Sequence, residues 1–380
     1  MKNGIIGMFL CLFIPYLLSA QYEYEVTTLL PTGENLIDDG LTIAPDGTVY
    51  GSHWGVWPSV TGTHILRVNP DGTYENFVTG VNRPNGMSYH NGQLYFANSG
   101  TGELMVADAD GQTTALQTVP GGLSNVVGKP GSDTLMLITW GSTILRGWSP
   151  DDGLFNFGQS TLLNGAAGGA FAENGDFFIA NYDDGKIIKY ANGEFSLHAS
   201  LGGGIGFITY SDGVLLATNH IDHKVYQVSP VDGSTEVIAG SGTAAVVDGI
   251  GSTASFNTPN GIVATASGDT IYVSDFGPKT LRMIVRRMPS SLTVANPEKS
   301  TVTAFPLPAS DYLQLKSEDW PELQQAVLMD AQGRTLKIFD SWNWASDSLD
   351  VQDVPAGVYW LQLRDPGGAT LQTIAVPIQR

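Results

Sequence analysis

Cysteine is nearly absent from this sequence: the one cysteine in 380 residues is Cys11. It lies in an N-terminal segment predicted to be removed, so the mature chain relies on no disulfide and offers no thiol nucleophile. Basic residues are also few, with 18 Lys and Arg against 37 Asp and Glu, and the formal net charge is −19. Nucleic-acid binding requires a basic surface that neutralises phosphates, so this composition excludes nucleic acid as a partner.

Long hydrophobic runs are absent beyond the N-terminus. There, Lys2 supplies a positive charge, residues 5–18 are apolar, and Leu18-Ser19-Ala20 offers small residues for cleavage. This layout predicts a secretory signal peptide over residues 1–20. A membrane anchor is the alternative interpretation, but the apolar run is short and Pro15 interrupts it. We therefore expect no transmembrane segment once the signal peptide is removed.

The chain also lacks the 3.6-residue hydrophobic periodicity of amphipathic helices, which indicates an all-β protein. Glycine is abundant instead, at 46 residues, and Asn-Gly and Asp-Gly pairs separate short β-rich runs. One unit recurs: a Gly-led apolar stretch, a turn, a β-rich run, a corner and a hairpin. Its first turns are mostly about 40 residues apart. They fall at Gly47, Gly92, Asp133, Gly175, Gly213 and Asp269.

A period near 40 residues with four short strands per unit is typical of a β-propeller blade. Six copies predict a six-bladed β-propeller over residues 21–289. The sixth copy has only three strands of its own and ends near residues 281–285. The alternating segment Tyr22–Leu30 would supply the missing outer strand, which would close the ring and cover two sheet edges.

The last of these units resembles a known repeat. Five of its segments are similar to the NHL repeat: Ala239–Gly242, Asp248-Gly249, Phe256–Ile262, Ile271–Asp275 and Leu281–Ile284. The other five units match the NHL repeat less closely, and they resemble the six-bladed propellers of the SMP-30/gluconolactonase type equally well. Both resemblances imply the same fold over most of the chain.

The repeat stops after residue 289, and residues 290–300 are predicted to be a linker. Residues 301–380 contain short alternating runs separated by turns at Asp330–Gly333 and Pro355–Gly357. This pattern predicts a small Ig-like β-sandwich. Either of two faces of one late strand can be the buried one: Val358 with Trp360, or Tyr359 with Leu361.

Three blocks of this C-terminal segment carry a second resemblance. Phe305–Leu313, Val327–Arg334 and Leu349–Leu361 resemble, in order and in distance from the C-terminus, the type A sorting domain of the type IX secretion system of Bacteroidetes. The resemblance implies that the type IX secretion machinery is a partner. It also implies a secreted, extracellular or outer-cell-surface location, and no chemistry in the domain itself.

Chemistry in a propeller is expected at one mouth of the central channel. In an antiparallel blade the start of the first strand and the end of the second lie on the same face, so side chains from both points converge there. Ligand-binding candidates at the ends of second strands are His53, Trp54, Asn98, Trp140, Asn181, His220 and Asp275. Metal-binding candidates at the starts of first strands are Asp39, Asn85, Asn125 and Asn260.

The metal candidates have two interpretations. Carboxylate and amide oxygens suit Ca²⁺, and the SMP-30-like resemblance implies metal-binding Asp and Asn at such positions. Asn-Gly and Asp-Gly pairs are also ordinary turn residues. The family places a Glu at one of these positions, and this sequence has none there. That absence favours binding over hydrolysis.

The sequence therefore favours a secreted binding or recognition module whose ligand is a small molecule, a glycan or a protein. The alternative is a Ca²⁺-dependent hydrolase of the gluconolactonase kind, in which the four metal candidates hold the ion and bound water attacks the substrate. A structural surface protein is a third possibility. Motifs of other hydrolases, such as Gly-x-Ser-x-Gly and His-Glu-x-x-His, are absent.

Overall fold

The computed structural model describes residues 22–287, apart from 31, 32, 34, 35 and 57, and residues 302–380, apart from 318–322, 331–333, 341–347 and 366–369. The predicted signal peptide and the predicted linker lie outside the described residues. The chain divides after Arg287 into two compact units. The described residues contain no α-helix, which confirms the all-β prediction.

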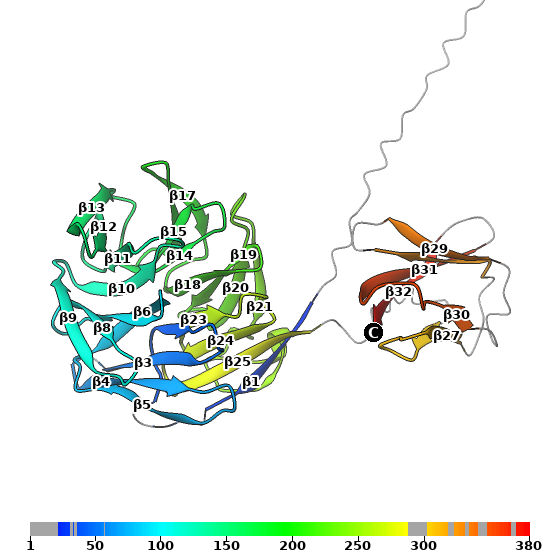
Figure 1. The fold of residues 1–380 in the computed structure, drawn as a ribbon, viewed down its shortest axis with the longest axis horizontal. Helices are drawn as coiled ribbons and strands as arrows, with labels where there is room; N and C mark the ends of the chain where they lie inside the picture. The colour runs from blue at the N-terminus through cyan, green and yellow to red at the C-terminus, as the bar shows by residue number, and fades with distance from the viewer. Residues whose placement is uncertain are drawn as a thin grey trace, which may run out of the picture. The chain divides into compact units, whose positions relative to one another are not determined.

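Within its described residues the first unit holds six antiparallel sheets, and five of them each consist of four strands consecutive in the chain (Figure 1). The first three are β2 (Leu41–Ile43), β3 (Val49–Val56), β4 (Val60–Val68) and β5 (Tyr74–Thr79); β6 (Pro84–His90), β7 (Gln93–Asn98), β8 (Glu103–Ala107) and β9 (Thr113–Thr118); and β10 (Leu123–Gly128), β11 (Leu135–Thr139), β12 (Ile144–Ser149) and β13 (Gly153–Gln159). The next two are β14 (Ala166–Phe171), β15 (Phe177–Asn181), β16 (Lys186–Ala191) and β17 (Glu194–Ser200); and β18 (Ile205–Ser211), β19 (Val214–Asn219), β20 (Lys224–Val228) and β21 (Thr235–Ala239).

The sixth sheet combines both ends of this unit. Its strand order is β22-β1-β25-β24-β23. The strands are β1 (Glu23–Thr28), β22 (Gly249–Ile250), β23 (Pro259–Ala264), β24 (Thr270–Asp275) and β25 (Thr280–Arg287), and a 3₁₀ turn, η1 (Gly251–Thr253), follows β22. β1 pairs with β25, with Val26 opposite Ile284, so the N-terminal segment does supply the missing strand. β22 then pairs with the other edge of β1.

The first strands of the six sheets form a closed series. β2 contacts β6, β6 contacts β10, and the series continues through β14, β18 and β23 back to β2. Figure 1 shows the sheets arranged around a common centre, which is the arrangement of a β-propeller. Each of six apolar clusters is shared by two neighbouring sheets, as where Tyr50 and Ile65 pack with Phe96 and Met105. The core therefore lies between the sheets.

Two glycines show why the first strands come so close. A Cβ atom on Gly40 would lie 2.6 Å from the Cα of Gly86 in the next sheet. A Cβ on Gly261 would lie 2.1 Å from the carbonyl oxygen of Asp39. The Asp-Gly and Asn-Gly pairs at these positions thus permit close packing of neighbouring sheets. Glycine is needed here because a side chain would clash, whereas glycine in a two-residue hairpin turn is needed because its φ is positive.

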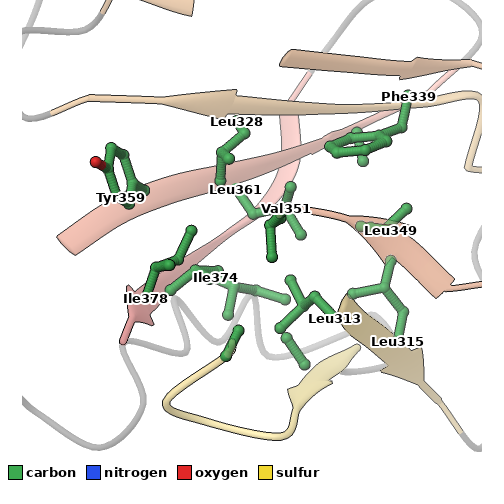
Figure 2. Packing of buried hydrophobic residues seen from close by; sticks show 14 of the residues in the cluster. Leu313, Leu315, Leu328, Phe339, Leu349, Val351, Tyr359, Leu361, Ile374 and Ile378 are labelled. Carbon is green, nitrogen blue, oxygen red and sulfur yellow. The ribbon is translucent and has the colours of Figure 1, made fainter. Parts of the chain in front are cut away.

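The second unit contains two sheets among its described residues, with orders β26-β27-β30 and β29-β28-β31-β32. Figure 2 shows apolar side chains from both sheets pointing toward one another. Tyr359 and Leu361 are buried, so their face of β31 is the one that packs in the core. The strands are β26 (Thr303–Phe305), β27 (Tyr312–Lys316), β28 (Gln325–Met329), β29 (Thr335–Asp340), β30 (Ser348–Asp350), β31 (Gly357–Arg364) and β32 (Thr370–Ile378).

Candidate functional site

A cavity of about 490 Å³ lies where the starts of the first strands and the ends of the second strands meet. Its rim is built by equivalent positions in the six sheets. In five sheets the rim residue follows the last residue of the second strand, and in the first sheet it lies near the end of β3. These residues are Trp54, Ser99, Trp140, Tyr182, His220 and Phe276.

Five of these positions carry rings that form a continuous series, which we call the aromatic arc (Trp140, Tyr182, His220, Phe276 and Trp54). The distances between successive ring centroids, in that order, are 5.2, 5.6, 5.7 and 6.5 Å. The arc runs through the third, fourth, fifth, sixth and first sheets. The second sheet has a serine at the same position. The rim is therefore aromatic on all sides but one.

The floor of the cavity carries polar groups from the starts of the first strands. Asp39 is buried, and its Oδ1 accepts a 3.0 Å hydrogen bond from Nδ2 of Asn260. Burial raises the pKa of Asp39 well above its usual range, and the neighbouring carboxyl of Asp38 raises it further. Oδ1 of Asn85 is buried and has no hydrogen-bond partner among the described residues. The floor thus offers hydrogen-bond acceptors in an apolar setting.

His220 adds an acceptor from the rim. Its Nδ1 is buried without a hydrogen-bond partner in the described part of the chain. Burial lowers the pKa of His220 to about 4, with a further contribution from His223, so the imidazole is neutral near pH 7. The residues that line the cavity include no lysine and no arginine. Arg83 lies beside the rim, with its guanidinium 4.8 Å from the ring centroid of Trp54.

The structure places the predicted ligand-binding residues in two groups. Trp54, Trp140 and His220 line the cavity. The other four are buried and do not line it: His53, Asn98, Asn181 and Asp275.

Three of these buried residues bind the backbone of the segment that leads into their own sheet. Oδ1 of Asn98 accepts from the amide of Asn82 at 2.8 Å. Nδ2 of Asn181 donates to the carbonyl of Leu162 at 2.7 Å. Both carboxylate oxygens of Asp275 accept from the amide of Asn257, at 2.8 and 2.9 Å. Each polar side chain holds the backbone so that the next residue faces the cavity.

Sequence reasoning missed two members of the arc, Tyr182 and Phe276, together with Ser99. The available signal was their position, since each directly follows an Asn or Asp at the end of a second strand. Successive side chains of an extended chain point to opposite sides. Because the Asn or Asp side chain turns away to bind the backbone, the side chain of the next residue faces the channel mouth.

Three of the four metal candidates, Asp39, Asn85 and Asn260, line the same cavity. Asn125 does not line it, and its Oδ1 accepts from the amide of Val126 at 2.8 Å. Ser124 occupies the cavity wall instead. The residue of this strand that reaches the cavity is therefore Ser124, one position before the predicted Asn125.

This donor set does not fit a Ca²⁺ ion, which takes six to eight oxygen ligands. Asp39 supplies the one carboxyl group of the cavity lining. The amide nitrogen of Asn260 faces that carboxyl. The described residues include no group of three or more His, Cys, Asp or Glu side chains that could hold a metal ion.

Comparison with known families decides the role of the second unit. Residues 303–377 match the family described as a secretion system C-terminal sorting domain. The chain carries a type IX sorting domain. The sorting domain directs export to the cell surface or the extracellular space. No helix among the described residues has the length and apolar character needed to cross a membrane. No curated protein matches the sequence of the chain.

The propeller is similar to solved structures with low sequence identity. An auxiliary nutrient binding protein from Bacteroides ovatus has a TM-score of 0.58 and 15% identity, covering 70% of this chain and 78% of that chain. A gluconolactonase from Xanthomonas campestris has a TM-score of 0.55 and 14% identity, covering 69% and 90%. A protein of unknown function from Bacteroides thetaiotaomicron has a TM-score of 0.60 and 12% identity, covering 70% and 77%. This likeness shows the fold alone.

Proposed function

We propose that the chain is an exported binding protein that takes a small ligand at the channel mouth. In this proposal residues 1–20 are a signal peptide, and residues 21–289 form a six-bladed propeller related to NHL and SMP-30 propellers. Residues 290–300 are a linker, and residues 301–380 are an Ig-like sorting domain handled by the type IX machinery of a Bacteroidetes-like bacterium. Each sheet of the first unit then corresponds to one blade.

The observation that carries the binding function is the aromatic arc above a polar floor, where Oδ1 of Asn85 has no hydrogen-bond partner among the described residues. Ligand pockets typically have volumes of about 300–1,000 Å³ and an apolar or aromatic lining with a few convergent polar groups. The cavity of about 490 Å³ has this composition. Asp39, Asn85 and Asn260 converge on its floor from three different sheets.

The hydroxyl groups of the cavity support binding over catalysis. Ser99 Oγ donates to the carbonyl of Leu123 at 2.8 Å. Ser124 Oγ lies 3.0 Å from the carbonyl oxygens of Ile138 and Ala166. A serine nucleophile requires a base within hydrogen-bond reach, and both hydroxyls are instead committed to the backbone. The poor fit to Ca²⁺ argues in the same direction against a lactonase-like hydrolase.

The experiment is a ligand screen on the purified protein, read by intrinsic tryptophan fluorescence and by thermal shift. The library contains saccharides, amines, carboxylates, nucleosides and lactones, each measured with calcium and with chelator. We expect saturable binding that is independent of calcium and at least tenfold weaker in Trp140→Ala. Val231→Ala, at an exposed position outside the cavity, is the matched control. Calcium-dependent turnover of a lactone, or binding unaffected by Trp140→Ala, would contradict the proposal.

A further inference from the structure

The aromatic arc is open on one side, at the second sheet. Ser99 takes the rim position there, Gly100 follows it, and Gly122 of the next sheet also lines the cavity. The Ser99 hydroxyl is held against the wall by its hydrogen bond to Leu123. Side chains at this point are thus small, whereas each of the other five sheets presents a ring. A ligand longer than the cavity can leave across the second sheet without displacing a ring.

Two unpartnered acceptors lie in sheets that face each other across the channel. Asn85 belongs to the second sheet, and His220 follows the second strand of the fifth sheet. In a closed series of six sheets the second and fifth are opposite one another. Leaving a buried acceptor without a hydrogen bond is unfavourable. Both atoms are shielded from solvent, so a ligand that offers hydrogen-bond donors on two opposite edges would satisfy them once the Asn85 and His220 side chains rotate toward it.

The charge of the lining restricts the ligand further. No lysine or arginine lines the cavity, so an anionic ligand would find no counter-charge there. Burial raises the pKa of Asp39 and lowers that of His220, and both shifts reduce the charge of the cavity lining. Arg83 lies beside the rim, but it is buried against Trp54. A neutral ligand is the best match.

We propose that the cavity binds a neutral oligosaccharide whose terminal ring stacks on the aromatic arc and whose chain leaves across Ser99. Hydroxyl groups on opposite edges of the terminal ring donate to Asn85 Oδ1 and, with its Nε2 protonated, to His220 Nδ1. The apolar face of a sugar ring packs on an aromatic face, while its edge carries donors in several directions. This inference rests on the proposed binding function and names its ligand class.

The first test is an array of neutral oligosaccharides of two to six glucose, xylose, mannose or galactose units, printed beside uronate-containing counterparts. We expect the purified protein to bind neutral members and to discriminate against the uronates. Asn85→Ala and Tyr182→Ala should each weaken binding at least tenfold, measured by titration calorimetry. Val231→Ala should leave the affinity within a factor of two.

The second test addresses the opening of the arc. Ser99→Trp places a ring in the second sheet, so we expect tetrasaccharide affinity to fall at least tenfold while disaccharide affinity changes less than threefold. Val231→Trp adds the same ring at an exposed position outside the cavity and should alter neither affinity. Ser99→Ala reports whether loss of the Leu123 hydrogen bond alone has an effect, and melting temperatures establish that each variant is folded.

The outcomes separate the two proposals. If no neutral saccharide binds, or if only uronates bind, the oligosaccharide inference is wrong. A ligand of another class that loses affinity in Trp140→Ala would preserve the binding function and overturn only the ligand class. Equal losses for disaccharide and tetrasaccharide in Ser99→Trp would refute the exit across the second sheet.

Discussion

Asn260 donates a 3.0 Å hydrogen bond to Asp39 across 221 residues of sequence. The bond joins the last sheet to the first at the point where the ring closes, and it lies at the floor of the cavity. Ser274 reinforces it, because its Oγ donates to the carbonyl of Asp39 at 2.6 Å and accepts from the amide of Gly261 at 2.7 Å. Ring closure and site geometry therefore depend on the same few residues.

Gly261→Ala should destabilise the propeller strongly. The added Cβ would lie 2.1 Å from the Asp39 carbonyl oxygen, which is backbone and cannot rotate away. Overpacking typically costs about 1–3 kcal/mol, and we expect the upper end here because the contact is with backbone. Gly203→Ala is the matched control, since its Cβ would meet nothing closer than 4.0 Å. Urea unfolding followed by tryptophan fluorescence measures both, and similar unfolding free energies for the two variants would refute the packing argument.

Much of the fold is local in the sequence and could be predicted from it. Alternation in Tyr22–Leu30 revealed an edge strand that needed a partner, and β1 pairs with β25 as expected. The pair Asn91-Gly92 marked a hairpin because both residues tolerate positive φ, and both have it, at 48° and 81°. Turn chemistry and hydrophobic alternation are properties of neighbouring residues, so they can be read without the tertiary structure.

The site was harder to predict, because it depends on irregular pairing. The register between β10 and β11 shifts between Leu123 and Asn125, so Ser124 reaches the cavity and Asn125 does not. A bulge of this kind reverses which side chain faces the channel. At the ends of the second strands, the sequence alone could not show that Asn181 serves the backbone while Tyr182 faces the ligand.

The stability of the propeller should fall as pH rises from about 4 to 7. Burial raises the pKa of Asp38 and that of Asp275 to about 7, against about 3.9 for an unfolded Asp. In this window the folded state holds more protons than the unfolded state, so the free energy of unfolding decreases with pH. The slope is up to ~1.4 kcal/mol per pH unit for each group.

Urea titrations at half-unit steps of pH measure this slope. Asp38→Asn should flatten it, while retaining an acceptor for the amide of Trp54, which Asp38 now binds at 2.6 Å. His53 and Lys279 face Asp38, and both are unchanged in this variant. Asp151→Asn, at an exposed position, should leave the slope intact. If the unfolding free energy of Asp38→Asn falls with pH as steeply as that of the unmodified protein, a group other than Asp38 causes the pH dependence.

Arg282→Ala should cost far more than the loss of an exposed arginine. The Arg282 side chain is fully buried, donates to the carbonyl of Ser255 at 2.8 Å, and lies 3.6 Å from the buried carboxylate of Asp275. Removing Arg282 leaves the buried carbonyl of Ser255 and the buried carboxyl of Asp275 without this partner, at a cost of about 1–3 kcal/mol for each group. Arg67→Ala removes the exposed pair with Glu75 and should cost under about 1 kcal/mol. Equal losses in denaturant unfolding would contradict this assignment.

Val26→Ala tests whether the N-terminal strand closes the whole ring. Val26 is fully buried and packs in one cluster with Phe256 and Ile284, so its truncation removes apolar contacts where the two ends of the unit meet. We expect a loss of about 2 kcal/mol. The same substitution at Val231, which is 89% exposed, should cost under about 0.5 kcal/mol. If β1 closes one cooperative ring, Val26→Ala should lower the unfolding midpoint reported by hydrogen exchange of the β11 amides, far along the chain. An unchanged midpoint for β11 would mean that β1 detaches without opening the ring.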